Sequence, residues 1–281
     1  MTRRGSLHPL YQLARGNSCT FGAALLVAGA LGGNSPAGTP WRRVGLAAAM
    51  TWFAIAFAQT YNDLVDVEAD AAAGRHRPLV TGTVSPSAAR LMCTAVIVAS
   101  LVASAFSHPL LVPIAGSTIV LSFFYSRWLK GIPIAGTLTV AALAAFPVPV
   151  GAWLTTRSVQ IESLALYAQI LTLQFAFEIL KAARDIEVDR KFHISTTAVW
   201  LGLDRSLVLS FGLTIIFSLL TVVVILAFRP SLLFCVAFGF VSFLVVWIAR
   251  SAHRRGPNYI GRVLRGFPYA WGIGIVGLAL F

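Results

Sequence analysis

The chain has 281 residues, of which 57% are hydrophobic and 11% are charged, and it carries a formal net charge of +12. Its hydrophobic residues come in long blocks that a soluble domain of this length would not need, so the composition excludes an ordinary soluble protein. An excess of basic residues can indicate nucleic-acid binding, but here most of the basic residues fall in the segments that would lie on one side of a membrane. We therefore expect the lipid bilayer, and no nucleic acid, as a partner.

Nine hydrophobic blocks follow one another along the chain. A helix that crosses a bilayer needs roughly 20 mainly apolar residues. The blocks run approximately over 19–33, 44–59, 88–107, 110–124, 134–153, 164–179, 206–228, 232–248 and 263–280. Pro147 and Pro149 interrupt the fifth block and predict a kink there. The sequence therefore predicts an all-α integral membrane protein with nine transmembrane helices, formed by a single domain over residues 1–281.

The basic residues are distributed asymmetrically between the blocks. Of the 22 Lys and Arg residues, only Arg42, Arg43, Arg157 and Arg229 fall on the side opposite the N-terminus. Because cytoplasmic loops carry an excess of Lys and Arg, this predicts a multi-pass protein of the cell membrane with a cytoplasmic N-terminus. Nine spans then place the C-terminus outside. The predominance of Arg over Lys, with abundant Ala and Gly, favours a bacterial source.

Three aspartates follow the second block at helical spacing. Asp63, Asp66 and Asp70 are related as i, i+3 and i+7, which places them on one face of a continuing helix beside Asn62. Glu68 points elsewhere. Like charges this close destabilise a helix, and carboxylates near the hydrocarbon boundary are costly, so a compensating cation is expected. Hard oxygen ligands grouped in this way suit Mg²⁺, which completes its coordination with waters and substrate phosphates.

A second acidic group follows the sixth block, on the same side of the membrane. Asp185 and Asp189 are i, i+4 neighbours, while Glu187 faces roughly the opposite way. A solvated acidic loop beside a membrane helix is the simpler interpretation, but most of the ten Asp and Glu residues lie in these two segments. Two acidic stripes that face each other across a helical bundle are therefore expected, with an active site on the cytoplasmic side.

Basic residues lie beside both acidic groups, as a phosphate site requires. Mg²⁺ bridges phosphate oxygens, while Arg supplies bidentate hydrogen bonds and Lys a point charge. Arg77 and Lys191 are interpreted as phosphate ligands rather than as anchors at the membrane surface. Glu178 has Lys181 at i+3, and it either pairs with that lysine or serves as a base on the acceptor side.

Several segments carry a family resemblance. Residues 62–70, which read Asn-Asp-Leu-Val-Asp-Val-Glu-Ala-Asp, resemble the NDxxDxxxD signature of the UbiA superfamily of intramembrane prenyltransferases. Residues 184–190 resemble the second DxxxD motif of that family. Further similar segments follow the family's order: Arg15 with Asn17, Arg77-Pro78-Leu79 with Gly82, and Tyr125-Ser126 with Lys130. After the second motif the family commonly has Gly-Lys and a Thr, whereas residues 192–197 read Phe-His-Ile-Ser-Thr-Thr, so Lys191 is a candidate for the missing lysine.

The resemblance implies a bundle around a central cavity and a Mg²⁺-dependent reaction. A prenyl group would pass from an isoprenyl diphosphate to a lipophilic acceptor, expected to be aromatic, through an allylic carbocation. The implied metal ligands are Asn62, Asp63, Asp66 and Asp70 for one ion and Asp185 and Asp189 for another. The implied catalytic residues are Asp63, Asp66, Asp185, Asp189 and Tyr125, whose ring would face the cation. The implied substrate-binding residues are Asn17, Asn62, Arg77, Ser126, Lys130 and Lys191.

Other functions are weighed against this one. A UbiA-type membrane terpene cyclase, which acts on a linear prenyl diphosphate without an acceptor, would carry the same motifs and stays open. An ion-coupled transporter would place acids near the midplane of several helices, often in repeated halves, whereas here they cluster at one surface. The DG-x(2)-AR run of phospholipid head-group transferases is absent. The aromatic residues Phe53, Phe57 and Tyr61 share a helix face, which we interpret as packing.

Overall fold

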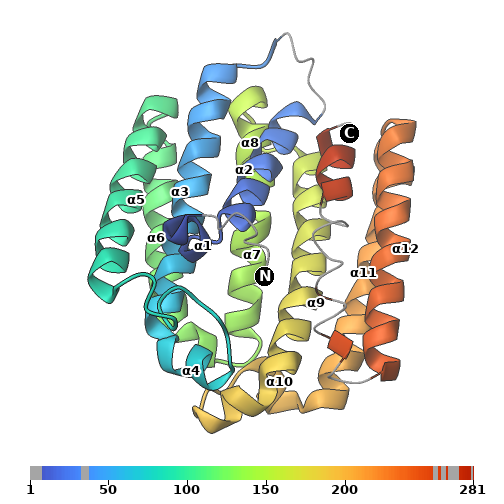
Figure 1. Cartoon of the computed structure of the whole chain (residues 1–281). Helices are drawn as coiled ribbons and strands as arrows, with labels where there is room; N and C mark the ends of the chain where they lie inside the picture. The colour runs from blue at the N-terminus through green and yellow to red at the C-terminus, as the bar shows by residue number, and fades with distance from the viewer. Residues whose placement is uncertain (1–7, 33–37, 256–258, 261–263, 265–271, 280) are drawn as a thin grey trace, which may run out of the picture. The chain divides into compact units, whose positions relative to one another are not determined.

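A computed structural model describes residues 8–32, 38–255, 259–260, 264, 272–279 and 281. This part of the chain folds into helices and contains no strand, which confirms the predicted fold class for it (Figure 1). The helices are α1 (Pro9–Leu13), α2 (Gly16–Leu31), α3 (Trp41–Val65), α4 (Val67–Ala72), α5 (Pro86–Ser107), α6 (Leu111–Arg127), η2 (Leu129–Gly131), α7 (Ala135–Ala145), α8 (Pro147–Thr156), α9 (Ile161–Lys191), α10 (Thr197–Leu201), α11 (Leu203–Phe228) and α12 (Leu232–Arg255).

Six of the described helical segments are long and apolar enough to cross a membrane. They are Trp41–Val65, Pro86–Ser107, Ala135–Thr156, Ile161–Lys191, Leu203–Phe228 and Leu232–Arg254. Helices α2 and α6 are apolar but shorter. Residues 263, 265–271 and 280 of the ninth predicted span, 263–280, lie outside the described residues, as do Arg3, Arg4, Arg262 and Arg265 of the charge pattern. The count of nine spans therefore stays a prediction.

The chain divides into two compact units, and the single domain expected over residues 1–281 stays a prediction. The first unit contains Met1–Ala23 and Gly45–Trp128, and the second contains Ala24–Val44 and Leu129–Phe281. The first acidic group belongs to the first unit, and the second acidic group belongs to the second unit.

In the first unit, helices α3, α5 and α6 enclose a small apolar core, and α5 packs beside α6 (Figure 1). Phe57, Val96 and Ile119 contribute from the three helices. One polar contact also joins α5 to α3: the buried Ser100 hydroxyl donates to the carbonyl oxygen of Met50 at 3.0 Å. A hydroxyl inside a membrane helix commonly satisfies itself on a backbone carbonyl in this way. These contacts hold the middle of α3, the helix whose last turn begins the first acidic group, against its neighbours.

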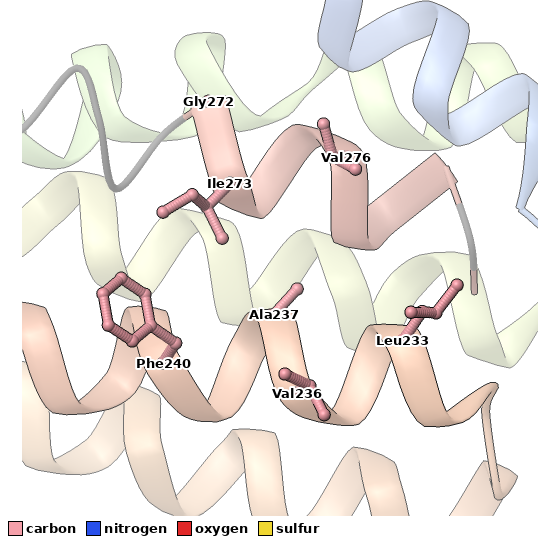
Figure 2. A pocket seen from close by; sticks show the side chains of 7 residues that line it. All are labelled: Leu233, Val236, Ala237, Phe240, Gly272, Ile273 and Val276. Atoms are coloured by element: carbon pink, nitrogen blue, oxygen red, sulfur yellow. The ribbon is translucent and has the colours of Figure 1, made fainter.

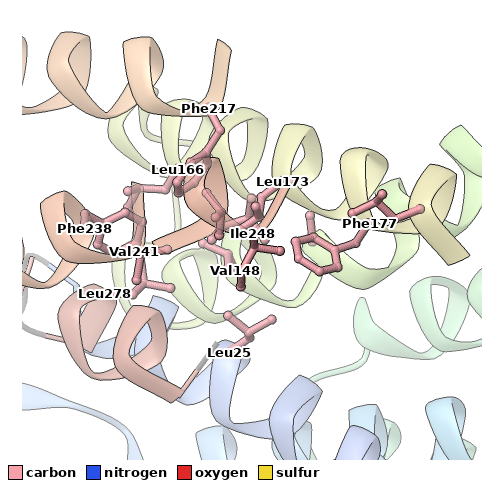
Figure 3. Close-up of a cluster of buried hydrophobic side chains, with 14 of the residues drawn as sticks. Leu25, Val148, Leu166, Leu173, Phe177, Phe217, Phe238, Val241, Ile248 and Leu278 are labelled. Carbon is pink, nitrogen blue, oxygen red and sulfur yellow. The ribbon is translucent and has the colours of Figure 1, made fainter. Parts of the chain in front are cut away.

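In the second unit, the long helix α9 packs against α7 and α11, and its apolar side joins the largest core of buried side chains (Figure 3). Phe177 from α9, Phe217 from α11 and Phe238 from α12 are almost completely buried there. The backbones of α8 and α2 also approach each other closely in this unit. A Cβ on Gly151 would lie 2.0 Å from the carbonyl oxygen of Leu26. Small residues allow membrane helices to pack this closely.

The predicted proline kink is confirmed. Helix α7 ends at Ala145 and α8 begins with Pro147, so the fifth span is built from two pieces that meet at Phe146. Proline cannot donate a backbone hydrogen bond, and its ring displaces the preceding turn.

An open apolar pocket of about 430 Å³ lies between α12 and residues 272–279 (Figure 2). Its lining residues are Leu233, Val236, Ala237, Phe240, Gly272, Ile273 and Val276. None of these side chains can donate, accept or carry a charge. The pocket is therefore not the predicted active site, and the polar groups described next are found elsewhere.

Candidate active site

The first acidic group lies where α3 meets α4. The helix does not simply continue as predicted: α3 ends at Val65, and Asp66, with φ −95° and ψ 9°, stands at the N-terminal boundary of α4 without a side-chain capping hydrogen bond. Two backbone hydrogen bonds still bridge the junction, from Asp66 N–H to the Asn62 carbonyl (2.9 Å) and from Asp70 N–H to the Asp66 carbonyl (2.8 Å). The interruption therefore leaves the three aspartates on one face.

Burial confirms which face that is. Asp63, Asp66 and Asp70 are 1%, 8% and 2% exposed, whereas Glu68 is exposed. The side-chain amide of Asn62 donates to Asp66 Oδ2 at 2.9 Å, so the asparagine orients one of the carboxylates. Three buried carboxylates in two turns require compensating positive charge.

Arginines supply that charge to Asp63. Arg15 Nη2 donates to Asp63 Oδ1 at 2.5 Å, and Arg77 Nη1 lies 3.7 Å from Asp63 Oδ2. Arg15 occupies the turn between α1 and α2 with φ 50°, a backbone region that non-glycine residues rarely adopt. The buried Oδ2 atom of Asp63 accepts no hydrogen bond.

Asp70 is compensated in the same way. Arg75 Nη1 donates to Asp70 Oδ1 at 2.5 Å, and Arg77 Nε lies 3.5 Å from Asp70 Oδ2. Burial lowers the pKa of the Arg77 guanidinium, the nearby charge of Arg15 lowers it further, and the two aspartates oppose that shift. Arg77 therefore sits between two carboxylates and beside another guanidinium, an arrangement suited to accepting a further anion.

The remaining predicted residues of the first unit are engaged locally. Asn17 Oδ1 accepts a hydrogen bond from the Tyr11 hydroxyl at 3.0 Å. The Ser126 hydroxyl is buried and donates to the Ser122 carbonyl within α6 at 3.2 Å, while Tyr125 is half-buried.

The aromatic stripe of α3 proves to be packing, as interpreted from the sequence. Phe57 is buried in the core of the first unit, and its ring stacks on Tyr61 with centroids 5.6 Å apart. The ring of Tyr61 in turn stacks on Phe123 of α6 at 5.0 Å.

The second acidic group lies in the last turns of α9. Asp189 is buried and its Oδ2 atom accepts a hydrogen bond from the Thr196 hydroxyl at 3.1 Å. Asp185 binds its neighbour Arg184 through two hydrogen bonds of 2.8 Å. Glu187 is exposed, as its helical position predicts, and so is Lys191 at the end of the helix.

The sequence also predicts a substrate-binding role for Lys130 and two alternatives for Glu178, both in the second unit. Lys130 lies in the short helix η2 and is half-buried. Glu178 and Lys181 form an ion pair, with Lys181 Nζ 2.7 Å from Glu178 Oε1. The pairing alternative for Glu178 is therefore the one that the structure contains.

Comparison with known proteins identifies the family. The sequence model of the UbiA prenyltransferase family matches residues 20–271 of the chain. A digeranylgeranylglyceryl phosphate synthase of Halobacterium salinarum is 32% identical over 202 residues, which cover 72% of this chain and 70% of that protein. The chain belongs to the UbiA prenyltransferase family. The resemblance seen in its motifs is thereby confirmed, and the protein is a membrane protein.

Solved structures support the UbiA fold. A UbiA homologue from Aeropyrum pernix has a TM-score of 0.76 at 18% identity, covering 92% of this chain and 96% of that one. A UbiA homologue from Archaeoglobus fulgidus, bound to GPP and Mg²⁺, has a TM-score of 0.71 at 23% identity, covering 96% and 98%. These relatives are archaeal, and the bacterial source expected from composition stays a prediction.

The acidic residues of the two groups carry carboxylate oxygens, the ligand type that Mg²⁺ prefers. Among the described residues, no three His, Cys, Asp or Glu side chains lie close enough together to hold a metal ion. Asp63 and Asp70 instead bind arginines. The donors nevertheless fit the ion: they are hard oxygen ligands, the four carboxylates of Asp63, Asp66, Asp70 and Asp189 are buried, and Asp63 Oδ2 has no hydrogen-bond donor. The predicted ligand set is thus a proposal that the chemistry of the donors supports.

Two contacts in the site are not predictable from the sequence motifs. Arg15 belongs to a motif, but its partner Asp63 is 48 residues away. Thr196 lies in the segment that departs from the family pattern, and its hydroxyl donates to Asp189. In that same segment His193 has φ 55°, in the region that favours glycine, which marks the turn that brings Thr196 back to α9.

Proposed function

We propose that this UbiA-family protein transfers the prenyl group of an isoprenyl diphosphate to a lipophilic acceptor in a Mg²⁺-dependent reaction. The observation that carries the proposal is the buried group of Asp63, Asp66 and Asp70 with arginines on two of its members. Such a group is costly in or near a membrane unless it binds cations. Alternating carboxylates and guanidiniums are also what a metal-bound diphosphate needs.

The metal would be held by the residues that the motifs indicate. Asn62, Asp63, Asp66 and Asp70 would bind one Mg²⁺, and Asp185 and Asp189 would bind another. When bound, Mg²⁺ supplies Lewis-acid stabilisation of the negative charge on a leaving diphosphate. Arg77, Lys130 and Lys191 would add hydrogen bonds and positive charge to the same group. Asn17 and Ser126 would complete the substrate contacts.

The proposed chemistry follows from these roles. The bond between the allylic carbon and the diphosphate oxygen breaks, and its electron pair leaves with the diphosphate. The acceptor then forms a bond to that carbon and releases a proton. The ring of Tyr125 would stabilise the allylic cation until the acceptor attacks. The prenyl tail is apolar, and the exposed apolar side chains of the long helices, such as Leu226 and Phe243, keep the protein in the same medium.

Transfer to an acceptor is favoured over cyclisation. The Halobacterium salinarum relative is named as a synthase of a glyceryl phosphate that carries two geranylgeranyl groups, and the family itself is named for prenyl transfer. An aromatic acceptor, expected from the sequence, and a prenylated glyceryl phosphate are therefore the two acceptor classes to test. The active site is proposed to face the cytoplasm, on the side where most Lys and Arg residues lie.

The test is product analysis with the purified protein in detergent. It is incubated with prenyl diphosphates of several lengths and Mg²⁺, together with either an aromatic acceptor panel or a prenylated glyceryl phosphate. We expect a prenylated acceptor and free diphosphate only when Mg²⁺ is present. A cyclic hydrocarbon formed without an acceptor would establish the cyclase instead. Failure to consume any prenyl diphosphate would overturn the proposal.

A further inference from the structure

Two consecutive threonines after α9 make contacts in different directions. The Thr196 hydroxyl donates to Asp189 Oδ2 at 3.1 Å, and both side chains are buried. Thr197 Oγ1 accepts a hydrogen bond from the Ile134 backbone N–H at 2.8 Å and lies 2.6 Å from the Thr137 hydroxyl. Thr197 is only 1% exposed. One dipeptide therefore joins the second acidic motif to the segment between η2 and α7.

The backbone at Ile134 is strained. Its φ is 63° and its ψ is −56°, and the Ala135 N–H donates to the Pro133 carbonyl at 2.7 Å. These values describe a γ-turn with a positive central φ, which is rare for any residue and an outlier for a β-branched one. Such a conformation persists only where its surroundings hold it. The hydrogen bond from Ile134 N–H to buried Thr197 is the contact that does so from outside the turn.

The strained turn is coupled to the segment that carries Lys130. Gly136 packs against η2 so closely that a Cβ there would lie 2.3 Å from the Leu129 carbonyl oxygen and 3.1 Å from the Lys130 Cα. Only glycine fits this contact. The backbone on either side of Lys130 therefore depends on the first turn of α7, and that turn depends on Ile134 and Thr197.

Thr196 acts on Asp189 from a fixed position of its own. Its hydroxyl oxygen accepts from the Val199 N–H at 3.4 Å and caps the start of α10. A hydroxyl that is anchored by a cap and donates to a buried carboxylate fixes the orientation of that carboxylate. Asp189 is thus oriented before any ligand arrives.

We propose that Thr196 and Thr197 are positioning residues of the active site. Thr196 orients Asp189, and Thr197 holds the strained turn that sets the backbone of Lys130. This inference rests on the proposed function, which assigns metal binding to Asp189 and diphosphate binding to Lys130. It assigns roles to the segment in which this chain departs from the Gly-Lys pattern of its family.

The two roles are tested by binding measurements that need no turnover. Mn²⁺ binding to the purified protein is followed by electron paramagnetic resonance. Binding of farnesyl thiolodiphosphate, an analogue that ionises poorly, is followed by calorimetry. Thr196→Val should weaken Mn²⁺ binding about tenfold, because loss of a carboxylate's orienting partner typically costs this much. Thr197→Val should weaken binding of the analogue and leave the Mn²⁺ affinity within about twofold, as expected when the metal ligands are undisturbed.

Conservative and control variants separate positioning from general damage. Thr196→Ser and Thr197→Ser keep the hydroxyl and should behave like the wild type. Thr139→Val is the matched control, because Thr139 is a half-buried residue of α7 whose hydroxyl donates to the Ala135 carbonyl within its own helix. It should change neither affinity. If Thr197→Val fails to fold, Thr197→Ser carries the test. It must fold and bind the thiolodiphosphate analogue with wild-type affinity, and a weaker affinity would overturn the role of Thr197.

Wild-type affinity for Mn²⁺ in Thr196→Val, or for the analogue in Thr197→Val, would overturn the corresponding role. A serine variant as impaired as its valine counterpart would do the same. A wild-type protein that binds neither probe would overturn the proposed function, and the positioning roles with it. Wild-type binding with unchanged variants would overturn only the positioning roles.

Discussion

Arg15 Nη2 lies 2.5 Å from Asp63 Oδ1, which joins the turn between α1 and α2 to the end of α3. Asp63 is almost completely buried, while Arg15 is about a quarter exposed. Arg15 also holds an unfavourable positive φ. The contact therefore compensates a buried charge and secures a strained turn.

Arg15→Ala should destabilise the metal-free protein by about 2 kcal/mol, because it removes the hydrogen-bond donor of the buried Asp63 Oδ1 atom. The measurement is the thermal unfolding midpoint in detergent without Mg²⁺. Arg90→Ala, at an exposed position of α5 in the same unit, should shift stability by less than about 0.5 kcal/mol. Equal shifts for the two variants would show that the Arg15 contact has no special weight.

Asp70→Asn should abolish most turnover, whereas Glu68→Gln should have little effect. The two residues are two positions apart, but Asp70 is buried with arginine partners and Glu68 is exposed. We expect a loss of at least about 100-fold for Asp70→Asn, the upper range for disturbed metal sites. Initial rates at saturating Mg²⁺ give the comparison. Similar losses in both variants would contradict the assignment of the buried face as the reactive one.

Glu178→Gln should retain nearly wild-type turnover and lose less than about 1 kcal/mol of stability. Glu178 is paired with Lys181; the Glu178 side chain is 12% exposed and that of Lys181 is 44% exposed, so solvent reaches the pair from the lysine side. Rate measurements over a range of acceptor concentrations test this expectation. A severe loss of kcat in Glu178→Gln, with Lys181→Gln unaffected, would instead support an acceptor-side base.

Gly151→Ala should destabilise the second unit by about 1 to 3 kcal/mol through overpacking. The new methyl group would meet the backbone of α2 at Leu26 and Ala30, which cannot rotate away as a side chain could. Gly212→Ala is the control, because Gly212 lies in α11 of the same unit with open space around it. That variant should be neutral or stabilised, since alanine favours the helix. The unfolding midpoint should therefore fall for Gly151→Ala and stay or rise for Gly212→Ala, and an equal fall in both would be inconsistent with the packing described.

Local patterns predicted much of the fold and part of the site. Hydrophobic blocks indicated helices, prolines indicated the break at Phe146, and helical spacing separated buried Asp63 from exposed Glu68. Each of these features depends on residues within a few turns of one another. Spacing along a helix determines such relationships directly.

Contacts between distant segments could not be predicted in this way. The Arg15 to Asp63 pair and the Thr197 to Ile134 hydrogen bond span 48 and 63 residues. They depend on how helices pack, which local periodicity does not encode. The interruption of the helix at Asp66 was also missed, because its sequence carries neither proline nor glycine there. Backbone changes without such residues leave no local signal.

The most direct test of metal-dependent ionisation by the two acidic groups is a measurement of diphosphate release from a prenyl diphosphate. It compares purified wild-type protein with the Asp63→Asn and Asp185→Asn variants. Circular dichroism of each variant first establishes that it is folded. Wild-type protein should release diphosphate with acceptor and Mg²⁺ and stop when the metal is chelated, while each folded variant should be slower by at least about 100-fold. Diphosphate release that continues without divalent metal would contradict metal-dependent ionisation by the acidic groups. A folded variant that keeps most of the wild-type rate would contradict it as well.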